Sequence, residues 1–105
     1  MTEPPLRLSL DHSCRRLLAW RGQLERGAQG EALESAFATE GFGLVDPQPG
    51  FVVFEESRTK HRVLVVPATG RLQVRLHYTT PEDQRPLEAA RIGEALGRAL
   101  EDAKT

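Results

Sequence analysis

The sequence has few of the features that secreted, membrane-spanning or disulfide-stabilised proteins need. Cys14 is the single cysteine, which excludes an internal disulfide and is typical of a reducing compartment. Residues 1–5 are acidic and proline-rich with no apolar run behind them, so no signal peptide is expected. No stretch approaches the roughly 20 apolar residues that span a membrane. These absences predict a cytoplasmic protein without membrane contact.

Motifs for catalysis and for metal or nucleotide binding are also missing. The three histidines, His12, His61 and His77, form no HxH or HExxH pattern, and there is no CxxC pair. The chain has no GxSxG motif, and no glycine-rich phosphate loop precedes a helix. We therefore expect no metal, no cofactor and no enzymatic activity. A small enzyme whose catalytic groups come from distant parts of the chain is one alternative.

Asparagine is absent, isoleucine occurs once, and twelve arginines stand against two lysines. This bias is typical of a GC-rich bacterial genome. The 105 residues and the net charge of −1 predict a single domain, residues 1–105, with a flexible tail over residues 1–9. The charge is unevenly distributed along the chain. Residues 31–56 have six acidic and no basic side chains, whereas residues 57–80 have five basic and no acidic ones.

The stretch from Phe51 to Tyr78 predicts three antiparallel strands joined by two tight turns. A four-residue turn at 67–70, with a proline first and a glycine last, connects the second and third strands. It pairs Val63 with Val74 and Arg62 with Arg75. The turn at 57–60 contains no glycine, and it pairs Phe54 with Val63. Both hairpins then place the same apolar rows on one face, so the register is well specified.

The other face of these strands, here called the second face, is apolar at its centre and polar at its rim. The residues that we predict to form an interface there are Phe51, Val53, Arg62, Leu64, Val66, Arg71, Gln73 and Arg75. A middle strand that is apolar on both sides is normally covered on both sides. A helix of the same chain, a second copy or a different partner could provide the cover, and the helix is our first expectation.

Helices are predicted on both sides of these strands. One is expected from Asp11 or Ser13 to Gly27, with Arg21 inside its apolar arc, and a shorter one from Glu31 to Glu40. Residues 42–45 form a further edge strand, and the main C-terminal helix runs from Pro86 to about Ala103. The fold class is therefore α+β: two N-terminal helices, an antiparallel meander of three to four strands, and a C-terminal helix packed on one sheet face.

An apolar centre ringed by polar side chains, with arginine enriched, is typical of a protein interface. The sequence therefore predicts a non-enzymatic protein–protein interaction or regulatory module, self-associating as a homodimer through the second face. Nucleic-acid binding by the basic strand face over residues 58–77 is the main alternative. The basic residues of that alternative are Arg58, Lys60, Arg62, Arg71, Arg75 and His77.

Overall fold

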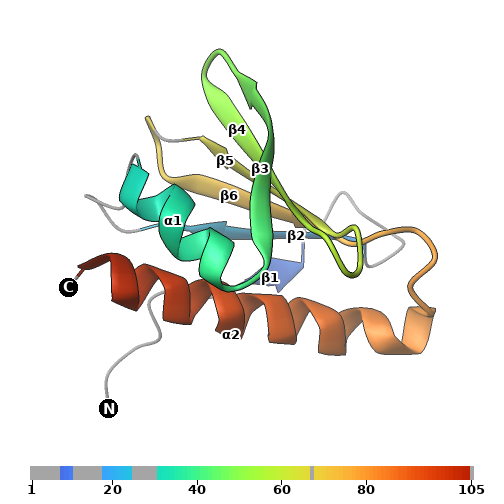
Figure 1. Ribbon diagram of the computed structural model, residues 1–105. Coiled ribbons are helices and arrows are strands. Elements are labelled where there is room, and N and C mark those ends of the chain that lie inside the picture. The colour runs from blue at the N-terminus through green and yellow to red at the C-terminus, as the bar shows by residue number, and fades with distance from the viewer. Residues whose placement is uncertain (1–7, 11–17, 25–30, 67, 105) are drawn as a thin grey trace.

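A single antiparallel sheet organises the computed structural model, which describes residues 8–10, 18–24, 31–66 and 68–104 (Figure 1). Its strand order is β1-β2-β6-β5-β4-β3. The strands are β1 (Ser9–Leu10), β2 (Ala19–Gln23), β3 (Phe42–Gln48), β4 (Phe51–Glu56), β5 (Arg62–Val66) and β6 (Arg71–Arg75). The helices are α1 (Glu31–Thr39), the single 3-10 turn η1 (Glu82–Gln84) and α2 (Arg85–Lys104). The α+β class and the antiparallel sheet are confirmed.

The predicted register of the central hairpins is confirmed. Phe54 pairs with Val63 and Val63 with Val74, while Arg62 pairs with Arg75. Gly70 closes the β5–β6 turn with a φ of 75°, and its amide donates to the carbonyl of Val66. A Cβ at Gly70 would lie 2.9 Å from the carbonyl oxygen of Leu24, so this turn requires glycine for both conformation and space.

The predicted helix from Asp11 or Ser13 to Gly27 is wrong in its described part. Residues 19–23 form β2, which pairs with β6 along its length, from Ala19 opposite Arg75 to Gln23 opposite Arg71. Residues 11–17 and 25–30 lie outside the described residues, as does most of the expected tail, of which Ser9 belongs to β1. The sheet thus has five strands of five residues or more plus the two-residue β1, instead of three or four.

The two other predicted helices and the edge strand are confirmed. The α1 helix ends at Thr39 and is followed by Gly41 with a φ of 89°. The β3 strand is longer than the expected 42–45 because it continues through a bulge between Leu44 and Asp46. The α2 helix begins one residue before Pro86 and ends one residue after Ala103.

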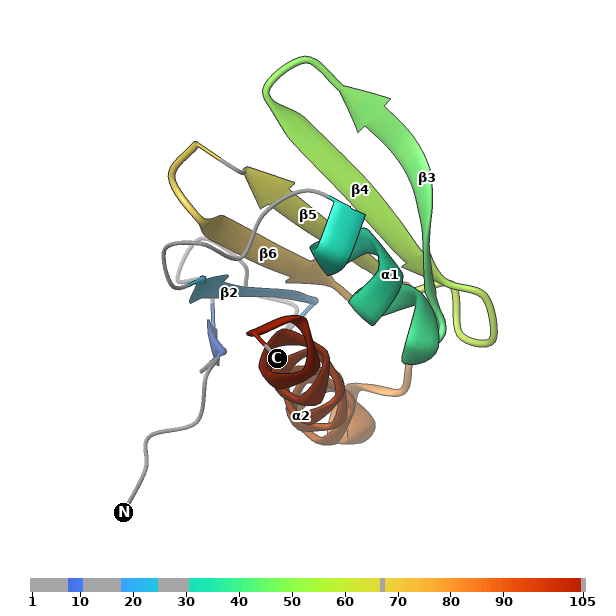
Figure 2. The same ribbon diagram turned by 60° about the vertical axis from the view of Figure 1, so that its left-hand side comes forward.

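Both helices pack on the same face of the sheet (Figure 2). The core between them and the sheet includes Phe37 from α1, Leu96 from α2, and Phe54 and Val63 from the strands, all at most 2% exposed. The expectation that a helix covers the second face is therefore not met by α1 or α2. No helix in the described part of the chain is long and apolar enough to cross a membrane.

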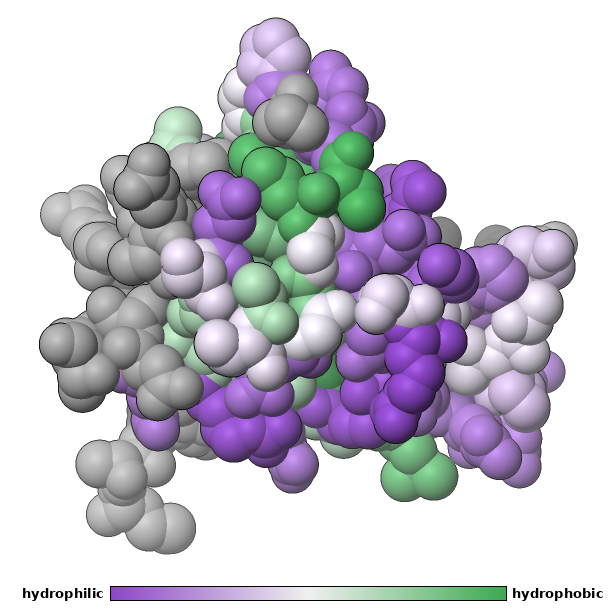
Figure 3. All heavy atoms as spheres, viewed as in Figure 1, coloured by the Kyte–Doolittle hydropathy of each residue, from purple (hydrophilic) through white to green (hydrophobic). Residues whose placement is uncertain are grey.

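Seen from the helix side, the surface over α2 is mostly hydrophilic, and green side chains gather higher up, over β3 and β4 (Figure 3). Leu44 and Val45 of β3 are 36% and 47% exposed. This edge strand contains a proline, Pro47, and the bulge between Leu44 and Asp46, two features that are common in edge strands and disfavour pairing with other chains.

Candidate functional site

The second face is a five-strand surface whose side chains line up in three rows. The register places the following residues side by side, from β2 to β3: Ala19, Arg75, Arg62, Glu55 and Gly43 in the first row; Arg21, Gln73, Leu64, Val53 and Asp46 in the second; Gln23, Arg71, Val66, Phe51 and Gln48 in the third. All eight residues of the predicted interface lie in these rows. Sequence reasoning thus found the centre of the face and missed its two flanks.

The flank provided by β2 changes the interpretation of Arg21. The sequence predicted this arginine inside the apolar arc of a helix. It instead lies in a strand, exposed on the second face next to Gln73. In β2, Trp20 and Gly22 face the core side of the sheet, and Arg21 and Gln23 face away from it. This alternation, together with a glycine in the middle of the predicted helix, was the sequence signal for a strand.

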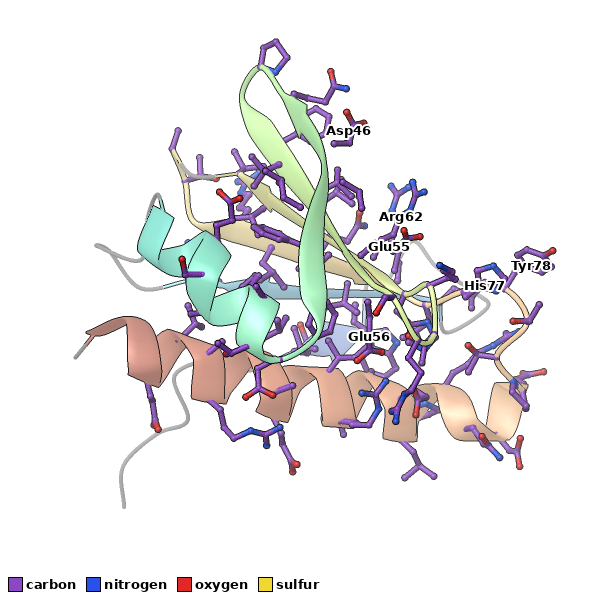
Figure 4. All side chains as sticks on the ribbon, in the orientation of Figure 1. Asp46, Glu55, Glu56, Arg62, His77 and Tyr78 are labelled. Carbon is purple, nitrogen blue, oxygen red and sulfur yellow. The ribbon has the colours of Figure 1, made fainter. Side chains whose placement is uncertain are left out.

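Charge separates the second face into two halves. The basic half, on β2 and β6, contains Arg21, Arg71 and Arg75, while the acidic half, on β4 and β3, contains Glu55 and Asp46. Between them lies β5, where Arg62 approaches Glu55 with 3.6 Å between its Nε and the carboxylate Oε1. Figure 4 shows Arg62 next to Glu55 and Asp46 farther along the β3–β4 hairpin, with Glu56 directed instead toward α2.

The basic half is also hollowed. A depression of about 700 Å³ lies over β2, β6 and β5, with Leu64 and Val66 among its apolar lining residues and Arg21, Arg71 and Gln73 among the polar ones. Leu64 and Val66 are partly exposed, whereas their neighbours Val63 and Val65 on the helix face are 0% exposed. The second face is therefore an accessible surface with charged flanks, and its apolar floor is open at Leu64 and Val66 but buried at Val53, which is 6% exposed.

A polar network joins the β4–β5 hairpin to α2 on the helix-covered side of the sheet, with Glu56 and His61 as its buried members. Arg91 of α2 donates two hydrogen bonds to the carboxylate of Glu56, at 2.8 and 3.0 Å, and two more to Glu88, at 2.8 and 3.2 Å. Glu56 also accepts from the Thr59 hydroxyl. Among the described residues no buried side-chain nitrogen or oxygen lacks a hydrogen-bond partner. The network therefore fastens the β4–β5 hairpin to α2.

His61 completes this network as a neutral ring. Its Nδ1 accepts from the backbone N–H of His77 at 2.8 Å, so Nε2 bears the proton and donates to Glu88 at 3.1 Å. Burial lowers the pKa of His61 below 6.5, although Glu88 acts in the opposite direction. The His61 ring hydrogen-bonds Glu88, while Glu56 meets His61 through the backbone, where the amide of Glu56 donates to the carbonyl of His61.

The carboxylates of the network are kept ionised. Burial acts to raise the pKa of Glu56, but the hydrogen bonds from Arg91 and Thr59 outweigh it and the pKa is lowered below 4.5. The pKa of Glu88 is lowered chiefly by the hydrogen bond from Arg91, against the effect of burial. Both carboxylates and the neutral imidazole thus bind fewer protons in the folded chain than in the unfolded one.

We expect the free energy of unfolding to fall as the solution is acidified. Below pH 6.5, His61 binds a proton more readily in the unfolded chain than in the folded one, because its pKa is lower in the fold. Below about 4.5 the same holds for Glu56 and Glu88. One proton gives a slope of at most about 1.4 kcal/mol per pH unit. Urea unfolding from pH 8 to pH 5 measures the loss due to His61, and its extension to about pH 3.5 measures the loss due to Glu56 and Glu88.

The control for the first step is His61→Asn, whose side-chain oxygen can still accept from the N–H of His77 but does not titrate. Its unfolding free energy should be lower at pH 8 and should change less between pH 7 and pH 5.5. An equally steep change in the variant would assign the pH dependence to other groups.

The described residues contain no group of three or more His, Cys, Asp or Glu side chains placed to bind a metal ion. In the network around Glu56, the ionisable side chains hydrogen-bond one another, and none of the described buried side-chain nitrogens or oxygens lacks a partner. The second face is consequently the candidate functional site. Comparison with protein-family models, with curated proteins and with solved structures found no match for this chain.

Proposed function

We propose that this protein is a small non-enzymatic interaction or regulatory module that self-associates through the second face. The observation behind this proposal is the difference between the two faces of one strand. In β5, Val63 and Val65 are fully buried beneath the helices, while Leu64 and Val66 are partly exposed on a face that neither helix covers. An apolar strip of this kind between arginines is the composition of an interface core and its rim.

Nucleic-acid binding is less well supported by the arrangement of charges. Phosphate binding favours a surface whose positive charge is not interrupted by acids. On the second face Glu55 lies beside Arg62, and Asp46 occupies the same side of the sheet. Only the half on β2 and β6 would suit a phosphate backbone, whereas the apolar centre and both charged halves together suit a protein.

The test is Leu64→Asp, compared with wild type by light scattering over a range of protein concentrations. Wild type is expected at twice the chain mass of 11.7 kDa. The aspartate puts a charge at the apolar centre, so the dimer should weaken by roughly 30-fold or more, the effect of losing a residue worth about 2 kcal/mol. Its circular dichroism spectrum should match wild type because Leu64 is not part of the helix-covered core.

Val63→Asp is the matched control, because it places the same charge one residue earlier on the buried face. This variant should unfold. If Leu64→Asp unfolds as Val63→Asp does, the second face is ordinary core. If Leu64→Asp is folded and as dimeric as wild type, the copies associate elsewhere.

A further inference from the structure

The second face is self-complementary in charge when it is turned about an axis parallel to its strands. Its middle strand is β5, with β6 and β2 on the basic side and β4 and β3 on the acidic side. A two-fold axis along the strands and over β5 exchanges the sides but keeps each residue in its row. It therefore lays β2 of one copy over β3 of the other, β6 over β4, and β5 over itself.

We infer that the partner on the second face is a second copy of this chain, related by a two-fold axis parallel to the strands and passing over β5. This inference rests on the proposed function and specifies its geometry. In a two-fold dimer each contact occurs twice, so a face must be complementary to its own rotated image. The rows of the second face meet this condition at the flanks, at the centre and between the two.

At the flanks, the axis brings Arg21 of β2 over Asp46 of β3 in the middle row and Gln23 over Gln48 in the third. In the first row it brings Arg75 over Glu55. Arg21 and Arg75 thus each face an acidic residue and an amide faces an amide in both halves of the dimer, while Arg71 faces Phe51. Facing sheets lie about 10 Å apart with their strands within about 30°, so side chains at matching positions can meet.

At the centre, Leu64 and Val66 lie under the axis and pack against their own copies. The hollow of about 700 Å³ lies over β2, β6 and β5, the part of the face on which β3, β4 and β5 of the second copy would rest. Arg62 also meets its own copy. Glu55 of the same chain, 3.6 Å away, lies beside it and offsets that repulsion.

The other in-plane two-fold axis, perpendicular to the strands, is disfavoured by the same charges. It would leave β2 over β2 and β6 over β6, and the arginines of one basic half would face those of the other. Like charges juxtaposed across an interface cost several kcal/mol. The charge pattern therefore selects one of the two arrangements.

Charge reversal tests the arrangement directly. Arg21→Asp and Asp46→Arg each place like charges together at both ends of the interface, so each should raise the dimer dissociation constant roughly tenfold or more. The double variant, Arg21→Asp with Asp46→Arg, restores opposite charges and should return to within a few-fold of wild type. Glu101→Arg, an exposed reversal on α2, is the control and should leave the dissociation constant unchanged.

The position of the axis has a second test that does not depend on charge. With Cys14 replaced by serine, Leu64→Cys should be joined to its own copy by a short bifunctional thiol reagent that spans the roughly 10 Å between facing sheets, because only a residue near the axis meets its own copy. Arg71→Cys, in the same face but off the axis, should not.

The outcomes separate this inference from the proposed function. A wild-type protein that is monomeric up to its solubility limit overturns both. A dimer that Leu64→Asp dissociates, but that neither Arg21→Asp nor Asp46→Arg weakens, keeps the second face as the interface and overturns this two-fold arrangement. A double variant as weak as the single ones overturns the pairing of Arg21 with Asp46.

Discussion

Replacing Arg91 by methionine is expected to lower the free energy of unfolding by about 3 kcal/mol. The guanidinium supplies two of the hydrogen bonds to Glu56, whose side chain is 7% exposed. Without it, the hydroxyl of Thr59 is the remaining side-chain donor to the buried carboxylate. Breaking a buried ion pair from one side costs about 3–5 kcal/mol, and the 32% exposure of Arg91 places this case at the low end.

The matched control is Arg98→Met, two turns farther along α2. Arg98 also pairs with a glutamate, Glu40, at 3.2 Å, but its side chain is 60% exposed. Surface pairs of this kind contribute little because water and salt screen them, so Arg98→Met should not change the unfolding free energy measurably. Equal losses in the two variants would mean that the network around Glu56 contributes no more than a surface ion pair.

The cause of the Arg91→Met loss can be separated from lost packing. Adding Glu56→Gln removes the stranded charge, so the double variant should be more stable than Arg91→Met alone. The deficit of Arg91→Met should also shrink on acidification below pH 4.5, because Glu56 can then be protonated. Urea unfolding of wild type, Arg91→Met, Glu56→Gln and the double variant, each at two pH values, measures both effects. A pH-independent deficit that Glu56→Gln does not relieve would assign the loss to packing.

Local patterns were sufficient to predict the central strands and their register. Turn chemistry at 67–70 and the alternation of Leu72 and Val74 with Arg71 and Gln73 specify one pairing, and that pairing is observed. The helix that became α2 was predictable for the same reason, since Ile92, Leu96 and Leu100 repeat at helical spacing and all are buried. These elements are determined by neighbours within a few residues along the chain.

Local patterns gave only a weak indication of the strand β2, namely the polar–apolar alternation around Arg21 and the glycine at position 22. Leu18, Trp20 and Leu24 fit a helical face as well as a strand, and a periodicity argument cannot distinguish them. The strand exists because residues 19–23 pair with β6, about fifty positions later in the sequence. A sequence pattern does not show which distant strand offers a free edge. Without β2, the division of the second face into a basic and an acidic half could not be predicted either, because it depends on where β2 and β3 lie relative to β5.

Phe37→Ala should lower the free energy of unfolding by about 3–5 kcal/mol. The ring is 0% exposed and meets Phe54 of β4 edge to face, with 4.8 Å between ring centroids. Together with Leu33 and Ala36 it anchors α1 in the core, and a nine-residue helix is not stable without such packing. A domain of this size is stable by only about 5–15 kcal/mol, so the variant should be marginal or unfolded at room temperature.

Phe51→Ala is the comparison that bears on function, because it removes the same type of side chain, a phenylalanine, from the second face. Phe51 is only partly buried in the single chain, so its removal should cost about 1 kcal/mol in the monomer. In the dimer the same change removes an apolar contact from the interface and should weaken association. Urea unfolding at low protein concentration and light scattering at high concentration separate the two effects. If Phe51→Ala destabilised the monomer as much as Phe37→Ala does, the second face would be core, and it could not be the surface through which two copies meet.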